Sequence, residues 1–251
     1  MEKNKFIISG GGTGGHIYPA LSIADKINES FKNAEIKFVG AKGRMEMNIV
    51  PKYGYNIQGL WISGLQRSFS LKNIVLPFKL IVSFVQSLFI ILKYNPKFVI
   101  GTGGFASFPI VFISSILRIP TLIQEQNSFP GISNRLLSNY VNYISVAYDK
   151  MEKYFPSKKL FLTGNPIRES IANSNNLVDL KKELNIEESK IIILILGGSL
   201  GSDKINRTIE KNIDFINSKN AFIIWQCGKI YFNDYKKYNS NSVFVTDFIE
   251  D

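Results

Sequence analysis

Histidine and cysteine are almost absent from this sequence of 251 residues, which contains one of each, His16 and Cys227. A single cysteine excludes an internal disulfide framework and a cysteine-rich metal site. The remaining candidate ligands, Asp and Glu, do not cluster at the spacings that are typical of metal sites. We therefore expect no metal and no cofactor, and a reducing compartment for the chain.

A long uninterrupted apolar segment is also missing. Residues 76–92 form the longest apolar region, but four polar side chains interrupt it, and a spanning helix needs roughly 18 to 20 clean apolar residues. No charged and then apolar leader precedes the first expected strand, so we expect a cytoplasmic location. We predict a non-spanning helix at 76–92, which is either a core helix or rests on an anionic membrane. A membrane contact would use these side chains: Phe78, Val82 and Phe89, with Lys72, Lys79 and Lys93.

Acidic residues are in deficit. The sequence contains 20 Asp and Glu residues and 30 Lys and Arg residues, which gives a net charge of +10 and an isoelectric point near 9.5. This balance favours an anionic partner: nucleic acid, an acidic membrane surface or a phosphorylated substrate. Because the basic residues are scattered and the phenylalanines are typical of a core, we do not expect nucleic acid.

Glycine, in contrast, is concentrated after the first strand. The apolar run 6–9 leads into a glycine turn at 10–15 and then into an apolar-striped helix at 17–30. Bare amides at a helix start suit an anion or a polar sugar. The turn also fits the G-x-G-x-x-G pattern, but no Asp or Glu ends the next strand, 35–39, to hold a ribose. A dinucleotide-dependent oxidoreductase is therefore disfavoured.

The same arrangement recurs along the chain. Strand 97–100 leads into a second glycine turn at 101–104, and strand 120–123 ends in the polar run 124–127. In an open parallel sheet, ligands bind beyond the carboxyl ends of the strands. These loops are therefore predicted to line one crevice of an α/β domain.

The pattern restarts in the last third of the chain. Strand 191–196 enters a glycine turn at 197–201, followed by a helix at 203–216 and strands at 221–225 and 243–245. We predict two domains, 1–163 and 164–251. A second sheet of three strands lacks covering helices at its edge, so we expect this domain to be incomplete.

Five loops, taken in order, resemble the bacterial cell-wall N-acetylglucosaminyltransferases of the MurG family. The resemblance is carried by Gly11-Gly12-Thr13-Gly14-Gly15-His16, Gly103-Gly104-Phe105-Ala106-Ser107-Phe108-Pro109, Glu125-Gln126-Asn127, Gly164-Asn165-Pro166-Ile167-Arg168 and Gly197-Gly198-Ser199-Leu200-Gly201. It implies two Rossmann-like domains of the GT-B type, an N-terminal one for acceptor and membrane and a partial C-terminal one for the UDP-sugar.

The implied activity is transfer of N-acetylglucosamine, with inversion, from UDP-N-acetylglucosamine to undecaprenyl-pyrophosphoryl-N-acetylmuramoyl-pentapeptide. This step converts lipid I to lipid II in peptidoglycan synthesis, at the cytoplasmic face of the inner membrane. The chain departs from the family at Gln124, where a His is frequent, and at its end, because members continue past Asp251 with donor contacts. The alternative is a non-catalytic fragment that retains binding of the lipid acceptor and the membrane.

Two residues are candidates for the base that the transfer needs. His16 lies at an expected helix start, which disfavours the imidazolium and keeps the ring able to accept a proton. It could instead only cap the helix or bind an acceptor phosphate. Glu125, at a strand end facing the same crevice, is the rival base or a structural carboxylate that holds the first glycine loop.

The remaining candidates bind substrate. The first loop offers Thr13, Gly14 and Gly15, and the acceptor loop offers Gly103, Gly104 and Ser107. The resemblance assigns Asn127 to the donor sugar and the backbone of Ile249 to the uracil. Arg168 and Ser199 would hold the pyrophosphate, the first through its guanidinium fork and the second at a helix start. The Asp-x-Asp pair of many metal-dependent glycosyltransferases is missing, so we predict metal-independent transfer.

Overall fold

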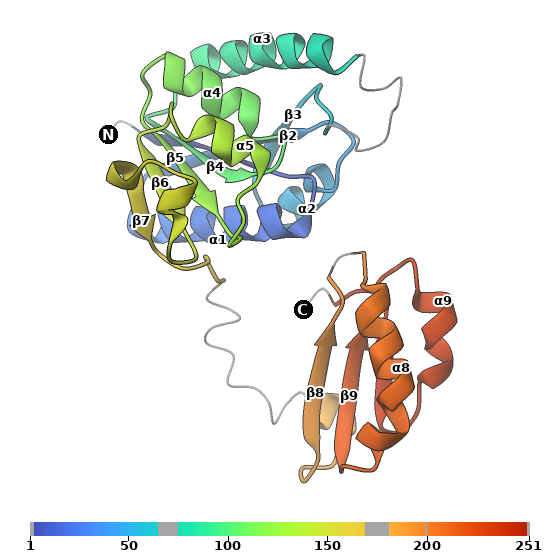
Figure 1. The fold of residues 1–251 in the computed structure, drawn as a ribbon. Coiled ribbons are helices and arrows are strands. Elements are labelled where there is room, and N and C mark those ends of the chain that lie inside the picture. The colour runs from blue at the N-terminus through green and yellow to red at the C-terminus, as the bar shows by residue number, and fades with distance from the viewer. Residues whose placement is uncertain (1–2, 65–74, 169–180, 199, 250–251) are drawn as a thin grey trace. The chain divides into compact units, whose positions relative to one another are not determined.

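The computed structural model describes residues 3–64, 75–168, 181–198 and 200–249 (Figure 1). The chain forms two compact units, residues 1–173 and 174–251, and each is described by itself below. The domain boundary expected near Gly164, and the roles expected for the two halves, stay predictions.

Unit 1 is built on a seven-stranded parallel sheet in the order β3-β2-β1-β4-β5-β6-β7. Its strands are β1 (Asn4–Gly10), β2 (Ala34–Ala41), β3 (Asn56–Leu60), β4 (Phe98–Gly103), β5 (Thr121–Glu125), β6 (Tyr143–Val146) and β7 (Leu160–Leu162). Neighbouring strands pair in parallel throughout. The order reverses between β1 and β4, because the chain leaves β1 towards β2 and later returns to the other side of β1.

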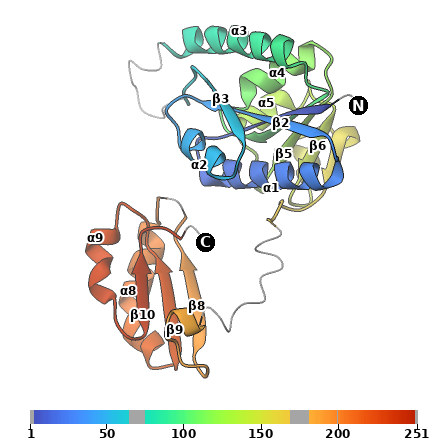
Figure 2. The same cartoon turned by 180° about the vertical axis from the view of Figure 1, so that it is seen from behind.

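Helices cover both faces of this sheet (Figures 1 and 2). One face carries α1 (Gly14–Ser30) and α2 (Glu46–Lys52), and the other carries α3 (Leu76–Tyr94), α4 (Phe108–Ile116) and α5 (Ile132–Leu137). Two short 3₁₀ turns, η2 (Met151–Lys153) and η3 (Ser157–Lys159), precede β7. Successive β1 side chains point to opposite faces, so Ile7 packs with the α3 and α4 core and Ile8 with the α1 core.

The expected first helix begins earlier than its apolar stripe predicts. Ile17, Leu21 and Ala24 are buried at helical spacing, as the pattern indicates. The helix nevertheless begins at Gly14, and Thr13 precedes it without a side-chain capping bond. The free N–H groups of this first turn therefore lie at the carboxyl edge of the sheet.

Helix α3 does not have the burial expected of a core helix. Only 22% of its most apolar window is buried, although its mean hydropathy is 1.7 and it is long and apolar enough to cross a membrane by length and composition alone. Its buried side carries Ser83 and Ser87, whose small side chains allow close approach to α4. The interpretation of 76–92 as a core helix is wrong, because its exposed stripe is the apolar one: Phe78, Ile81, Val85, Phe89 and Leu92.

Unit 2 repeats the parallel arrangement on a smaller scale. Its strands are β8 (Ile191–Leu196), β9 (Ala221–Gln226) and β10 (Val243–Thr246), in the order β10-β9-β8. Helices α8 (Asp203–Asn217) and α9 (Phe232–Tyr235) and the turn η4 (Lys236–Tyr238) pack around the fully buried Trp225. The Trp225 indole donates to Asn206 Oδ1 at 3.0 Å, and Asn206 in turn donates to the Cys227 carbonyl at 2.9 Å. The expected α/β class with parallel sheets is therefore confirmed in both units.

The double-sided core of unit 1 gives a stability prediction. Ile7→Ala removes a fully buried side chain from the central strand β1 and should lower the free energy of unfolding by about 2–5 kcal/mol. Ile116→Ala makes the same change where the side chain is 57% exposed, and should cost less than about 0.5 kcal/mol. Urea unfolding followed by circular dichroism measures both, and equal effects would contradict the burial seen here.

Candidate functional site

Three loops meet at the carboxyl edge of the unit 1 sheet. They follow the adjacent strands β1, β4 and β5 and lead into α1, α4 and α5. The strand order reverses between β1 and β4, and an open α/β sheet binds its ligands at such a reversal. The first two glycine loops meet at this reversal, where the sequence predicts a crevice, and the crevice itself stays a prediction.

The two glycine loops are in direct contact, and this contact requires glycine. Gly103 and Gly104 have φ angles of +99° and +79°, which disfavour other residues. A Cβ on Gly104 would lie 2.3 Å from the Gly11 carbonyl oxygen, and one on Gly103 would lie 3.0 Å from the His16 ring. The structure thus brings together three of the residues that the sequence analysis selected: His16, Gly103 and Gly104.

Hydrogen bonding sets the tautomer of His16. Its Nδ1 lies 3.1 Å from the Gly11 carbonyl oxygen and 3.2 Å from Thr13 Oγ1. Because a carbonyl oxygen can only accept, the contact with Gly11 requires the proton to be on Nδ1. This leaves the lone pair of Nε2 without a hydrogen-bond partner among the residues that the structure describes, beside Gly103, where a Cβ would be only 3.2 Å away.

The His16 environment favours the neutral ring. Burial lowers the pKa of His16 below its ordinary value of 6.5, against the raising effects of the Gly11 hydrogen bond and of the charges on Glu125 and Glu46. The expectation of a neutral imidazole near pH 7 thus has burial as its main physical cause, rather than the helix start invoked from the sequence.

Glu125 is a buried carboxylate with four hydrogen-bond donors. Oε1 accepts from the backbone N–H and the side-chain amide of Asn127 at 3.1 and 3.0 Å. Oε2 accepts from the Gly131 N–H at 3.0 Å and from the Asn134 amide at 2.9 Å. These donors all lie in the loop after β5 and in α5. The structural alternative predicts instead that Glu125 holds the first glycine loop, and among the described residues no hydrogen bond joins the two.

Asn134 belongs to the site although the sequence analysis did not select it. It is 2% exposed, and its amide donates to Glu125 and to the Gln124 carbonyl. Among the described residues, its Oδ1 is the buried side-chain atom left without a hydrogen-bond partner. No signal pointed to it, because the sequence pattern predicts no element at residues 132–137, where α5 lies.

The motif at 164–168 divides between two places. Asn165 joins the third loop, since it accepts from Gln124 Nε2 and donates to the Gln126 carbonyl, both at 3.4 Å. Arg168 instead donates to the Tyr53 hydroxyl at 3.0 Å and lies over the rings of Tyr18 and Tyr53. Tyr18 follows His16 by two helical positions, so the two side chains face different sides of α1. Arg168 is thus held away from His16 within unit 1, and its pyrophosphate contact stays a prediction.

The other selected residues have varied surroundings. The Ser107 hydroxyl is buried and donates to the Gly104 carbonyl at 3.0 Å, so it supports the shape of the second loop. Gly15 is exposed and Gly14 is buried at the start of α1. Ser199 lies outside the described residues. Ile249 packs against a small apolar cluster in unit 2 with Phe222 and Ile224.

Unit 2 also joins its loops at the carboxyl edge of its sheet. The buried Gln226 amide donates to the Gly198 carbonyl at 2.8 Å and to the Asp247 carbonyl at 3.2 Å. One side chain at the end of β9 therefore ties together the loops that follow β8 and β10.

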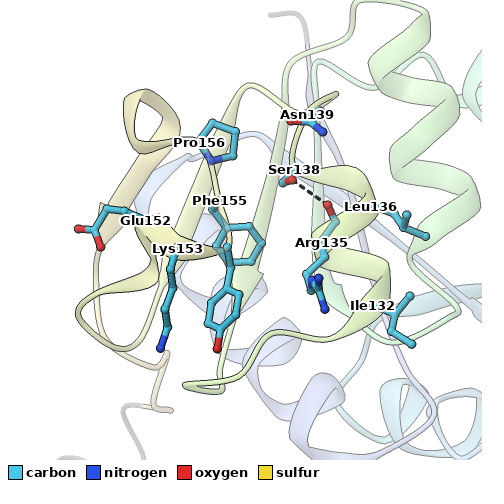
Figure 3. A pocket seen from close by; sticks show the side chains of 10 residues that line it. Ile132, Arg135, Leu136, Ser138, Asn139, Glu152, Lys153, Phe155 and Pro156 are labelled. Atoms are coloured by element: carbon cyan, nitrogen blue, oxygen red, sulfur yellow. Dashed lines mark hydrogen bonds between the residues drawn. The ribbon is translucent and has the colours of Figure 1, made fainter.

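A separate pocket of about 610 Å³ lies on the flank of unit 1, between α5 and residues 152–156 (Figure 3). Its charged side chains are Arg135, Glu152 and Lys153. None of the residues selected from the sequence lines it. Within the ranges that the structure describes, no group of three or more His, Cys, Asp or Glu could hold a metal ion.

Comparison with known proteins places this architecture in a class. The N-terminal domain of glycosyltransferase family 28 matches residues 6–146, and the C-terminal domain of the same family matches residues 192–251. Together these matches define a family 28 glycosyltransferase of two α/β domains.

Two curated relatives narrow the class. The UDP-N-acetylglucosamine–N-acetylmuramyl-(pentapeptide) pyrophosphoryl-undecaprenol N-acetylglucosamine transferase of Flavobacterium psychrophilum is 51% identical over 255 residues, covering 100% of this chain and 69% of the relative. The protein of the same name from Christiangramia forsetii is 50% identical over 249 residues, covering 99% and 68%. The chain belongs to this family of N-acetylglucosamine transferases, as its five loops predicted.

Solved structures agree at the level of the fold. The crystal structure of Acinetobacter baumannii MurG matches with a TM-score of 0.65 and 23% identity, covering 100% of this chain and 68% of that one. A UDP-GlcNAc 2-epimerase from Neisseria meningitidis matches with a TM-score of 0.63 and 15% identity, covering 98% and 72%. The expected two-domain fold is therefore confirmed.

The burial of His16 predicts how its ring titrates. The folded protein should show a titration midpoint below 6.5, and the urea-unfolded chain should show one close to 6.5. The unfolded chain then binds the proton first, so acidification below 6.5 should lower the free energy of unfolding. Ring-proton NMR measures both midpoints without ambiguity, because the chain has a single histidine. A folded midpoint at or above the unfolded one would contradict this account.

Proposed function

We propose that this protein transfers N-acetylglucosamine, with inversion, from UDP-N-acetylglucosamine to undecaprenyl-pyrophosphoryl-N-acetylmuramoyl-pentapeptide, which converts lipid I to lipid II. Membership of the family supports the reaction. The observation that carries the mechanism is the free Nε2 of a neutral His16 at the strand-order reversal.

In the proposed reaction, a sugar hydroxyl of the acceptor attacks the anomeric carbon of the donor. The new glycosidic bond forms as the bond to the UDP oxygen breaks, and UDP leaves with the electron pair. His16 Nε2 takes the proton of the attacking hydroxyl, while Nδ1–H stays bonded to the Gly11 carbonyl. The ring is suited to this role because burial keeps it neutral.

Glu125 then has a different role from His16. Its four hydrogen bonds hold the loop that carries Asn127, so it shapes the wall of the site. We assign Thr13, Gly14 and Gly15, with Gly103 and Gly104, to the acceptor side. Free amides at the start of α1 would bind an anionic group there, each interaction contributing about 0.3–2 kcal/mol.

Donor binding is assigned to unit 2. The glycine turn after β8 precedes α8, so its amides and Ser199 would bind the donor pyrophosphate. The backbone of Ile249 would face the uracil, and Asn127 the donor sugar. Arg168, which lies over Tyr18 and Tyr53 in unit 1, is the further candidate for binding the pyrophosphate.

The exposed face of α3 supports a peripheral location at the cytoplasmic side of the inner membrane. Its apolar stripe, from Phe78 to Leu92, is 48–67% exposed, and Lys93 lies exposed at the end of the helix. An apolar stripe flanked by basic residues favours binding at an anionic lipid surface. Such binding would bring the enzyme to its lipid-linked acceptor.

Two substitutions separate the candidate bases. His16→Ala should lower kcat roughly 100- to 10,000-fold while leaving the KM for UDP-N-acetylglucosamine nearly unchanged, because only the proton acceptor is lost. Glu125→Gln should mainly lower the free energy of unfolding, by about 1–3 kcal/mol, because one amide donor loses its acceptor. Radiolabelled sugar transfer to a lipid-linked acceptor and urea unfolding provide the two measurements.

The exposed Glu152→Gln serves as the matched control for charge and should change neither quantity. Near-normal turnover in His16→Ala, with loss in Glu125→Gln, would reverse the assignment. Calorimetry with UDP-N-acetylglucosamine tests the non-catalytic alternative, since a chain that only binds acceptor and membrane should show no donor binding.

Membrane binding has its own test. Wild-type protein should sediment with vesicles that contain anionic phospholipid more than with neutral vesicles, and less so at high salt. The double variant Phe78→Asn, Phe89→Asn should bind at least about tenfold more weakly, because two apolar contacts are lost. Phe215→Asn makes one such substitution at an exposed position of α8 and should bind normally. Equal binding to neutral and anionic vesicles would count against the proposal.

A further inference from the structure

Glu46 is a completely buried carboxylate that neither the sequence motifs nor the proposed mechanism uses. It is the first residue of α2 and has 0% exposure. Ionised groups are rarely buried in this way unless hydrogen bonds compensate for the lost hydration. Its surroundings therefore indicate what it does.

Both carboxylate oxygens of Glu46 accept backbone hydrogen bonds. Oε2 accepts from the Gly12 N–H at 2.9 Å, and Oε1 accepts from the Ala41 N–H at 2.9 Å. Two glycines leave room for the side chain, since a Cβ on Gly11 would lie 2.2 Å from Oε1 and one on Gly40 would lie 2.6 Å from Cγ. The fold thus reserves a space for this carboxylate between the first glycine loop and the end of β2.

The bond to Gly12 reaches His16 through a single peptide group. The Gly12 N–H and the Gly11 carbonyl belong to the same planar peptide. Its N–H donates to Glu46, and its carbonyl oxygen accepts from His16 Nδ1 at 3.1 Å. Hydrogen bonds in such a chain polarise one another, so a carboxylate on the N–H side makes the carbonyl a stronger acceptor.

We infer that Glu46 is a positioning residue that holds His16 in its Nδ1–H tautomer through the Gly11–Gly12 peptide, and so keeps Nε2 free to accept a proton. The inference rests on the proposed function for the use of that lone pair. Glu46 itself contacts no reacting atom.

Thr13 explains why the tautomer needs to be held. Its hydroxyl lies 3.2 Å from His16 Nδ1 and can either accept from Nδ1–H or donate to a bare Nδ1. Donation would place the ring proton on Nε2 and remove the acceptor that the reaction needs. The fixed Gly11 carbonyl excludes that arrangement. Glu125, the other carboxylate whose charge acts on His16, is bonded within its own loop.

The tautomer can be measured in the wild-type protein at neutral pH. Ring ¹⁵N shifts from long-range ¹H–¹⁵N NMR distinguish a protonated Nδ1 from a protonated Nε2, and the only histidine gives the only signal. We expect the Nδ1–H form to predominate. A predominant Nε2–H form would overturn the inference without any variant.

The substitution Glu46→Gln tests the link itself. A glutamine oxygen can accept only one of the two backbone N–H groups, and the charge is lost. The folded variant should show a mixture of tautomers, a lower titration midpoint of the His16 ring, and a kcat lowered roughly 10- to 100-fold. Glu35→Gln removes the same charge at the opposite end of β2 and should leave the tautomer as in wild type.

An unchanged tautomer ratio in a folded Glu46→Gln protein would overturn the inference, because a merely structural role would alter stability alone. If Glu46→Gln does not fold, Glu46→Asp is the second variant, because its shorter side chain keeps the charge but cannot reach both N–H groups. The same ring ¹⁵N measurement is then made on Glu46→Asp. The tautomer of the wild-type protein tests the inference whether or not either variant folds. Normal turnover in His16→Ala would contradict the proposed function. The NMR result does not depend on that assay, so the two proposals can fail independently.

Discussion

The site depends on the close contact between the glycine loops that follow β1 and β4. A side chain at Gly104 would collide with the Gly11 carbonyl, and one at Gly103 would press on the His16 ring. Because both positions lack a side chain, the Gly11 carbonyl and the His16 ring stay within hydrogen-bond distance. The tautomer, burial and low pKa of His16 all follow from this approach.

Two buried carboxylates hold the loops around that contact, each by accepting backbone N–H groups. Glu46 connects the first loop to β2, and Glu125 connects the end of β5 to the start of α5. Both are almost fully buried, and their hydrogen bonds compensate for the loss of hydration. These hydrogen bonds fix the loops on either side of His16, and a fixed orientation is what the proposed proton transfer requires.

Helix α3 shows that apolar composition does not by itself place a helix in the core. Ser83 and Ser87 lie on its buried side with Ile90, Ile91 and Tyr94, while five large apolar side chains form an exposed stripe, which the usual pattern of a surface helix lacks. The exposed stripe favours a lipid surface as the partner of that face. It also explains why the hydropathy of the segment was ambiguous, since hydropathy averages over both faces.

The sequence by itself determined the α/β class, nearly all strands, the family and the residues of the glycine loops, because apolar periodicity and turn glycines are local signals. Helix α5, the choice between a core and an outward-facing α3, and the contacts of Glu46 and Asn134 came only from the tertiary structure. So did the placement of Arg168 between two tyrosines rather than beside His16. These features arise from contacts between residues that are distant in the chain, such as Glu46 with Gly12 and Arg168 with Tyr53, and no local pattern encodes such pairs.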